Sequence, residues 1–121
     1  MNVASKRFTD LRVWQESHFL SLEIYKLTKE FPEEEAYGLS SQLRRAAVSV
    51  TSNIAEGFNR FSKKEKIQFY SIALGSVSEV HSQTILAKDL HYISDTDFKT
   101  AEEQIEIIHK ALAALIKSLR F

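Results

Sequence analysis

The chain of 121 residues contains no cysteine, one proline and three glycines. Without cysteine there is no disulfide, no zinc–thiolate site and no cysteine nucleophile. The absence of thiols fits a reducing cytoplasm, which is where we expect this protein. The scarcity of proline and glycine leaves few points at which a helix must break.

Long apolar runs are also missing. No stretch approaches the roughly eighteen consecutive apolar residues of a transmembrane helix, and residues 1–8 lack the apolar core of a signal peptide. Apolar residues make up 44% of the chain, which is too many for wholesale disorder. We therefore expect one soluble domain with a single core and no membrane contact.

Apolar residues recur at intervals of three and four along most of the chain, which predicts four helices. We place them at about residues 10–30, 40–57, 62–91 and 96–120. The loops between them are short, so neighbouring helices should run antiparallel. The prediction for residues 1–121 is an all-α, single-domain, up-down-up-down four-helix bundle.

Each expected helix has a seam that should face the core. The seams are Val13, Ser17, Leu20, Ile24, Leu27 and Phe31; Leu43, Ala47, Val50 and Ile54; Phe69, Ile72, Ser76, Val80, Gln83, Ala87 and Leu90; and Phe98, Ala101, Ile105, Ile108, Leu112, Leu115 and Leu119. Several helices carry further apolar residues, such as Trp14, Tyr25 and Ile107. Two explanations remain open for this surplus: a wide core-facing stripe, or a second face buried against another copy of the chain.

Local signals mark several helix ends. The dipeptide Phe31-Pro32 ends the first helix, because a residue before proline avoids the α region. Ser40 is a candidate N-cap for the second helix, and Gly57 suits its C-terminal cap. The third helix opens with a capping-box pattern, Ser62-Lys63-Lys64-Glu65. Gly75, inside the third helix, indicates either tight helix packing or the close approach of a ligand.

The second helix carries an unusual stripe beside its seam. Its side chains are small or polar where a surface helix would carry lysine and glutamate, and polar groups beside a seam need specific partners. We interpret this stripe, with one residue of the third helix, as a polar packing and assembly surface: Gln42, Arg45, Ser49, Asn53, Glu56 and Glu79. Arg44 and Arg45 either contact phosphate or pair with Glu56 or Glu79 of another subunit.

The net charge is zero, yet an antiparallel bundle would separate the two signs. The start of the first helix, the corner between the second and third, and the end of the fourth would meet at one end. This end holds ten basic residues against Asp10, Glu16, Glu56 and Glu65: Lys6, Arg7, Arg12, Arg60, Lys63, Lys64, Lys66, Lys110, Lys117 and Arg120. Such an end is either a solvated corner or the electrostatic footprint of a phosphate-backbone binder.

We assign RNA or DNA binding to seven residues of this end, which would contact phosphates without reading sequence. They are Arg60, Lys63, Lys64 and Lys66, helped by Lys6, Arg7 and Arg12. The alternative is a protein scaffold with no nucleic-acid role, whose basic end docks an acidic protein partner.

Catalytic chemistry finds little support in the sequence. The four histidines are scattered, and no Ser-His-acid arrangement or phosphate-cradling glycine loop is present. Glu106-Ile-Ile-His109 matches one step of a di-iron bundle site, but the second step is missing. We expect no enzyme activity, no catalytic residue, no metal and no cofactor.

Several motifs together resemble a known family: Asp10–Gln15, Ile24–Thr28, Phe31-Pro32, Tyr37–Leu39, Gln42–Val50, Ser52–Gly57, and Ile72–Ser76 with Glu79. Through them the chain resembles, over nearly its whole length, the four-helix-bundle proteins of the 23S rRNA intervening-sequence family. At Thr51 many members have proline, so we expect a more regular second helix here. The resemblance implies a ring-like homopentamer and a relationship to the accessory bundle proteins of diversity-generating retroelements, whose basic surface is associated with nucleic acid. It supplies no catalytic residue.

Overall fold

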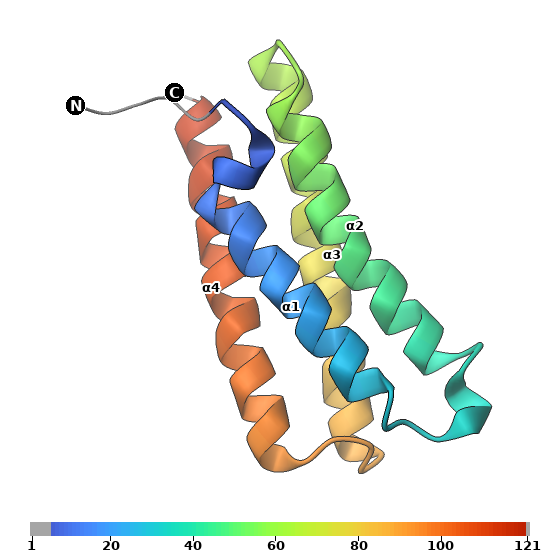
Figure 1. Cartoon of the computed structure of the whole chain (residues 1–121). Coiled ribbons are helices and arrows are strands. Elements are labelled where there is room, and N and C mark those ends of the chain that lie inside the picture. Colours follow the sequence, from blue (N-terminus) through green and yellow to red (C-terminus); the bar gives the residue numbers. More distant parts are fainter. Residues whose placement is uncertain (1–5, 121) are drawn as a thin grey trace.

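Four long helices account for most of the computed structural model, which describes residues 6–120 (Figure 1). They are α1 (Arg12–Thr28), α2 (Leu39–Phe58), α3 (Lys63–Asp89) and α4 (Asp95–Arg120). Two short 3-10 helices, η1 (Phe8–Asp10) and η2 (Glu33–Glu35), precede α1 and α2. The described part of the chain contains no strand.

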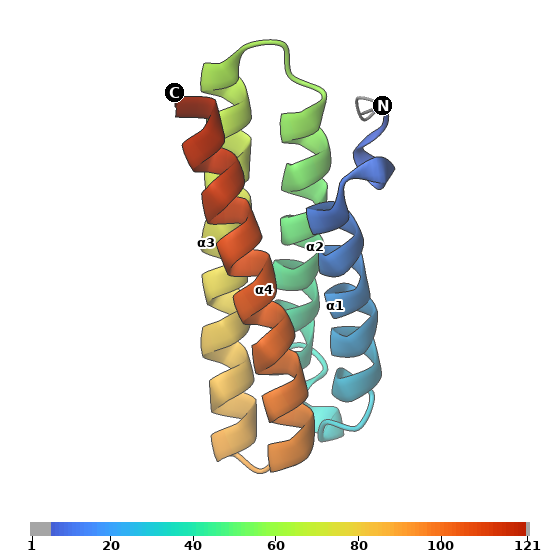
Figure 2. The ribbon, with the colours of Figure 1, turned by 90° about the vertical axis from the view of Figure 1, so that its left-hand side faces the viewer.

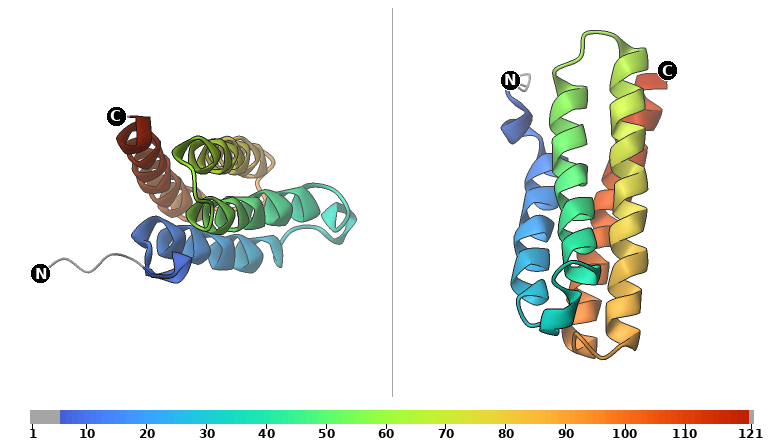
Figure 3. Two further views of the ribbon diagram at one scale, coloured as in Figure 1. Left: turned by 90° about the horizontal axis from the view of Figure 1, so that it is seen from above. Right: turned by 90° about the vertical axis from the view of Figure 1, so that its right-hand side faces the viewer.

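Successive helices run antiparallel, and each packs against the next (Figure 2). α1 also contacts α4, which closes the bundle. The start of α1, the α2–α3 turn and the end of α4 lie at one end, while η2 and the α3–α4 turn lie at the other (Figures 1 and 3). The predicted all-α, up-down-up-down four-helix bundle is confirmed.

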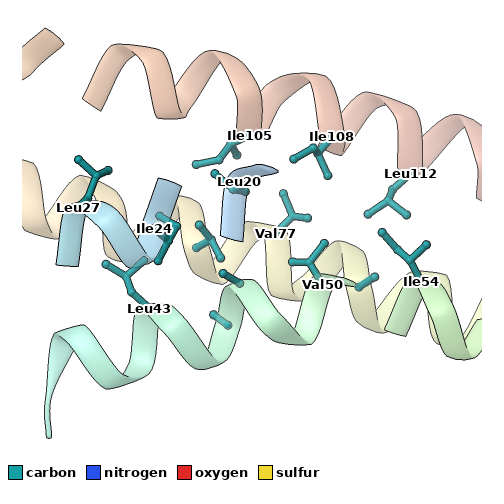
Figure 4. Close-up of a cluster of buried hydrophobic side chains, with 14 of the residues drawn as sticks. Leu20, Ile24, Leu27, Leu43, Val50, Ile54, Val77, Ile105, Ile108 and Leu112 are labelled. Carbon is teal, nitrogen blue, oxygen red and sulfur yellow. The ribbon is translucent and has the colours of Figure 1, made fainter. Parts of the chain in front are cut away.

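The core is a column of aliphatic side chains from all four helices (Figure 4). Its best-buried members include Leu20, Ile24, Leu43, Val50, Ile54, Val77, Ile105, Ile108 and Leu112. The predicted seams of the first and second helices are buried throughout, and that of the fourth is buried as far as Leu112. In the last turns of α4, Leu115 and Leu119 are only partly buried.

The face of α3 that points to the core differs from the predicted one. The buried residues are Tyr70, Ala73, Val77, Val80, Thr84 and Ala87. Ile72 and Leu90, which were expected in the core, are 47% and 44% exposed. The prediction is confirmed at Val80 and Ala87 and was wrong at Ile72 and Leu90. The reason is that α3 carries apolar residues on two sides, so that two stripes compete in the sequence pattern.

α1 is shorter than predicted at both ends. Phe8–Asp10 forms a separate 3-10 turn before the helix, and the helix ends at Thr28, three residues before Phe31-Pro32. The Thr28 hydroxyl donates to the Ile24 carbonyl at 2.7 Å in the last turn.

The N-terminus of α2 is capped by a residue that the sequence did not suggest. The N-cap position is Gly38, and the Leu39 amide donates to Oε1 of Glu35 at 3.2 Å. Ser40, the predicted cap, is buried in the first helical turn. Its hydroxyl is therefore not the capping group.

Gly57 does not cap the C-terminus of α2, because the helix continues to Phe58. Its role is close packing: a Cβ atom there would lie 2.7 Å from Cε1 of Tyr70. At Gly75 a Cβ atom would meet nothing within 4 Å. Tight packing, one of the two explanations considered for Gly75, is therefore absent there within residues 6–120, and it occurs at Gly57 instead.

The ends of α3 follow recognised capping patterns. The Glu65 amide donates to Oγ of Ser62 at 3.1 Å, which is the Ser62 half of the predicted capping box. At the other end His91 adopts a left-handed conformation with φ of 63°, and the Tyr92 amide donates to the Ala87 carbonyl at 2.9 Å. This Schellman-type ending directs the chain into α4.

Candidate nucleic-acid interface

The seven residues assigned to nucleic-acid binding lie at one end of the bundle, on two corners (Figures 1 and 3). Lys6, Arg7 and Arg12 lie at the start of the described chain, and Arg60, Lys63, Lys64 and Lys66 lie around the α2–α3 turn. Their local contacts divide them into residues that are free and residues that are held by the protein.

Lys63 and Lys64 form the start of α3, and both are exposed. Neither makes an ion pair with any described residue. The N-terminus of a helix carries partial positive charge, so each of these lysines lowers the stability of the helix by about 0.3–1 kcal/mol. These lysines therefore do not stabilise the helix, and an anion bound at this corner would be favoured by both lysines and by the helix.

Phe61 is the site residue that the sequence analysis missed. It lies in the α2–α3 turn beside the two lysines, and its ring is fully exposed. An exposed aromatic ring beside basic groups provides a surface on which a nucleobase can stack. The sequence pattern that could have identified Phe61 is the run Arg60-Phe61-Ser62-Lys63, in which an aromatic residue lies between two basic residues.

Lys66 has a structural role at the end of α2. Its Nζ donates to the carbonyls of Phe58 at 2.7 Å and of Gly57 at 3.3 Å. The last carbonyls of a helix have no partner within it, so Lys66 supplies a missing donor. Its assignment to phosphate binding stays a prediction.

Arg60 is also held within the chain. Its guanidinium pairs with Oε2 of Glu56 at 2.8 Å and lies over the Phe69 ring, 4.6 Å from the centroid. Both groups of the ion pair are substantially exposed, so the pair competes only weakly with a phosphate.

The second corner contains a segment anchored by its backbone. The amides of Lys6 and Arg7 donate to Oδ2 of Asp10 at 3.2 and 3.1 Å, while both residues remain exposed. Arg12 pairs with Glu16 at 3.2 Å, but its side chain is 90% exposed. Their assignment to nucleic-acid binding also stays a prediction.

Four of the six residues predicted as a polar surface find partners inside the chain. The hydroxyls of Ser49 and Ser76 are 2.8 Å apart, and the Gln83 amide donates to Oε1 of Gln42 at 3.3 Å. Both contacts join α2 to α3.

The other two satisfied residues bond to groups close to them in the chain and not to α3. Asn53 donates to the Ser49 carbonyl at 2.8 Å, and Glu56 holds the Arg60 guanidinium. Arg45 and Glu79, the last two members, are exposed and make no ion pair in the described structure.

Arg44 is fixed between α1 and α2. Its Nε donates to Oγ1 of Thr28 at 2.8 Å, and its guanidinium lies over the Tyr25 ring, 4.7 Å from the centroid. This arginine is held by α1, and it lies near the start of α2, toward the end of the bundle opposite the basic corners.

A groove of about 250 Å³ lies between α3 and α4. It is lined by Val77, Ser78, His81, Ile105, Glu106, His109 and Lys110. Nε2 of His81 is 2.8 Å from Oε2 of Glu102. Within residues 6–120, no group of three or more histidine or acidic residues is placed to hold a metal ion. None of the described helices is long and apolar enough to cross a membrane.

The pKa values of two tyrosine hydroxyls, those of Tyr70 and Tyr92, are raised. At the end opposite the basic corners, the Tyr92 hydroxyl donates to Oε2 of Glu35 at 2.9 Å. This hydrogen bond, then desolvation and the charges of Glu35 and Glu34, raise the pKa of Tyr92. Burial raises the pKa of Tyr70 in the core.

The fold and the basic end define a small α-helical bundle with one positively charged end. The family model for the 23S rRNA-intervening sequence protein matches residues 9–114, and the chain belongs to this family. A search of curated proteins finds no match.

Among solved structures, the chain is similar to a protein of unknown function from the S23 ribosomal protein family of Bacteroides thetaiotaomicron. The two are 25% identical and superpose with a TM-score of 0.81, over 87% of this chain and 98% of the other. This similarity supports the same fold and leaves the function open.

Proposed function

We propose that this protein is a non-enzymatic, self-associating bundle that binds single-stranded RNA or DNA at its α2–α3 turn. The observation that carries the proposal is the fully exposed ring of Phe61 beside Lys63 and Lys64, neither of which has a carboxylate partner within residues 6–120. An acidic protein surface would neutralise the lysines, but it would need a separate apolar site to bind the ring. A nucleic-acid strand engages both.

In this account each lysine neutralises a phosphate and releases a condensed counterion, which provides most of the affinity. Phe61 stacks on one unpaired base, which favours a single strand over a duplex. Neither contact reads base identity, so binding should tolerate many sequences. The name of the family refers to 23S rRNA intervening sequences, so RNA is the first ligand to test.

Self-association is the second part of the proposal, with the homopentamer of the family resemblance as its expected form. One turn with two free lysines is a weak site. Several turns repeated in one assembly would bind one strand together, and avidity would raise the affinity without any new contact.

The direct test is fluorescence anisotropy with a labelled single-stranded RNA at low salt. Lys63→Glu with Lys64→Glu should weaken binding by a hundredfold or more, because two attractions become repulsions. Phe61→Ala should weaken it about tenfold, since one stacked base contributes about 1–3 kcal/mol. Lys26→Glu with Lys29→Glu, exposed at the other end of α1, is the charge-matched control and should change little.

Absence of RNA and DNA binding in the unmodified protein would overturn the proposal, as would equal losses in the test and control variants. A purified protein that ignores nucleic acid, yet retains a protein partner after nuclease treatment, would establish the scaffold instead.

A further inference from the structure

Another cavity lies toward the end of the bundle opposite the basic corners, where α1, the α1–α2 connection and the first half of α2 meet (Figure 1). Its volume is about 430 Å³, within the range of about 300–1,000 Å³ that is usual for small-molecule sites. Its walls come from Tyr25 of α1, Tyr37 of the connection, and four residues of α2: Ser41, Arg44, Arg45 and Val48. The proposed function does not use this cavity.

Two arginines stand side by side in the α2 wall. The four α2 residues are spaced by three, one and three positions, so they share one face of the helix. Neither Arg44 nor Arg45 pairs with a carboxylate within residues 6–120. The acidic run Glu33–Glu35 is close in the sequence, but Glu35 accepts hydrogen bonds from the Leu39 amide and the Tyr92 hydroxyl. The cavity therefore contains two positive charges that no described carboxylate balances.

Arg44 is already held in one orientation. Its Nε donates to Oγ1 of Thr28 at 2.8 Å, and its guanidinium lies over the Tyr25 ring, 4.7 Å from the centroid. Thr28 is buried, so this hydrogen bond fixes the guanidinium at the protein surface. The terminal nitrogens Nη1 and Nη2 donate to no residue in the described range. A guanidinium that is fixed before binding loses little conformational entropy when it binds a phosphate through two parallel hydrogen bonds.

The aromatic side chains of the cavity provide a second kind of contact. The Tyr37 ring is fully exposed, and Tyr25 is 41% exposed. An exposed aromatic ring is a surface on which a nucleobase can stack. Inorganic phosphate would contact only the arginines, and an uncharged nucleoside would contact only the rings. A nucleotide would contact both.

We propose that the tyrosine–arginine cavity, defined as Tyr25, Tyr37, Ser41, Arg44 and Arg45, binds the phosphate monoester and base of a nucleotide. Arg44 and Arg45 donate to the phosphate oxygens, and the base stacks on Tyr37. This group occurs in a free mononucleotide and at the 5′-phosphorylated end of a strand. The cavity is separate from the basic corners, so the inference goes beyond the proposed function and does not depend on it.

The test is isothermal titration calorimetry of the full chain with adenosine 5′-monophosphate. The unmodified protein should bind it about tenfold or more tightly than adenosine or inorganic phosphate, because only the nucleotide contacts both the arginines and the ring. Arg44→Met and Arg45→Met should each weaken binding about tenfold or more, since each removes a charged hydrogen-bond donor. Tyr37→Leu should weaken it about tenfold, because it removes the stacking surface.

Conservative variants separate the chemistry of the site from a general effect on the protein. Arg44→Lys keeps the charge but loses the forked donor and the bond to Thr28, so it should weaken binding about threefold or more. Tyr37→Phe keeps the ring and should bind normally. Lys99→Met removes an exposed charge of α4 at the same end of the bundle and should also bind normally. Circular dichroism verifies that each variant keeps its helix content.

Competition identifies the source of the phosphate. In the Lys63→Glu with Lys64→Glu variant, a 5′-phosphorylated tetranucleotide should displace adenosine 5′-monophosphate better than its 5′-hydroxyl form if the cavity binds a strand end. If the cavity binds free nucleotides, neither tetranucleotide displaces it. Both results support a nucleotide phosphate site and assign its natural ligand.

The same variant keeps the two proposals apart. Lys63→Glu with Lys64→Glu should leave the affinity for adenosine 5′-monophosphate unchanged, even where it abolishes RNA binding. The inference would be overturned if the nucleotide did not bind, if adenosine bound equally well, or if Arg44→Met or Arg44→Lys kept full affinity. Loss of nucleotide binding in the Lys63 and Lys64 variant alone would also overturn it, because the nucleotide would then occupy the basic corner.

Discussion

Two glycines inside helices have opposite surroundings, which gives a sharp test of packing at the residue scale. A methyl group at Gly57 would overlap the Tyr70 ring, whereas one at Gly75 would enter open space. Gly57→Ala should therefore lower the free energy of unfolding by about 1–3 kcal/mol. Gly75→Ala should leave it unchanged or raise it by up to about 1 kcal/mol, because alanine is the better helix former.

Urea unfolding followed by circular dichroism measures both variants under the same conditions. If Gly57→Ala proved as stable as Gly75→Ala, the close contact between α2 and α3 would be disproved.

The lysines around the α2–α3 turn differ in what they stabilise. Lys66 supplies donors to the end of α2, so Lys66→Met should lower the free energy of unfolding by about 1 kcal/mol. Lys64 stands at the positive end of α3, so Lys64→Met should leave stability unchanged or raise it slightly. Thermal melts separate the two variants. For RNA affinity, Lys64→Met should instead cause the larger loss. If Lys66→Met caused the larger loss of both stability and RNA affinity, the division of roles would be contradicted.

At the scale of elements, the buried faces of α1, α2 and α4 were predictable, whereas the buried face of α3 was predictable only in part. The seams of the first, second and fourth helices led directly to their buried faces. In α3 the choice between the stripes of Ile72 and Val77 depends on which stripe packs against α2 and α4. The tertiary structure decides this, and the local sequence pattern does not. The cap of α2 also comes from outside the helix, from Glu35 in η2.

The candidate site shows the same limit. The lysines of the α2–α3 corner were predictable from charge and topology. The exposure of Phe61 and the capping contacts of Lys66 were not, because both depend on the path of the turn that joins α2 to α3. The sequence pattern predicts which residues lie near this corner of the bundle. The path of the turn determines which of their side chains contact the protein and which stay exposed.

The contact between η2 and the α3–α4 turn should make stability depend on alkaline pH. The pKa of Tyr92 is raised in the folded protein. Below about pH 10 the tyrosine is protonated in both states, and its hydrogen bond to Glu35 contributes fully. As the pH rises further, the unfolded state loses its proton first, so stability falls and the contribution is gone once the pH exceeds the folded-state pKa.

Tyr92→Phe should therefore melt at a lower temperature than the unmodified protein at pH 8, and the difference should shrink toward zero above pH 10. Tyr37→Phe is the control, because that ring is fully exposed, and it should show no such change. A difference between Tyr92→Phe and the unmodified protein that stays constant from pH 8 to the alkaline limit would contradict the link to Tyr92.

At the scale of the whole molecule, a net charge of zero conceals a strong separation of charge along the bundle. The antiparallel topology brings basic residues from three parts of the chain to one end. The acidic run at η2 and the acidic first turn of α4 lie at the other. Binding of a polyanion should therefore be local to one end and steeply dependent on salt.

The most direct test of the nucleic-acid account is the slope of the logarithm of the RNA association constant against the logarithm of salt concentration. Each phosphate contact on a single strand contributes about 0.7 to this slope. Lys63→Gln with Lys64→Gln should make the slope shallower by about 1.4 for each copy that contacts the strand. A slope that is the same before and after these substitutions, or binding that does not depend on salt, would contradict the account.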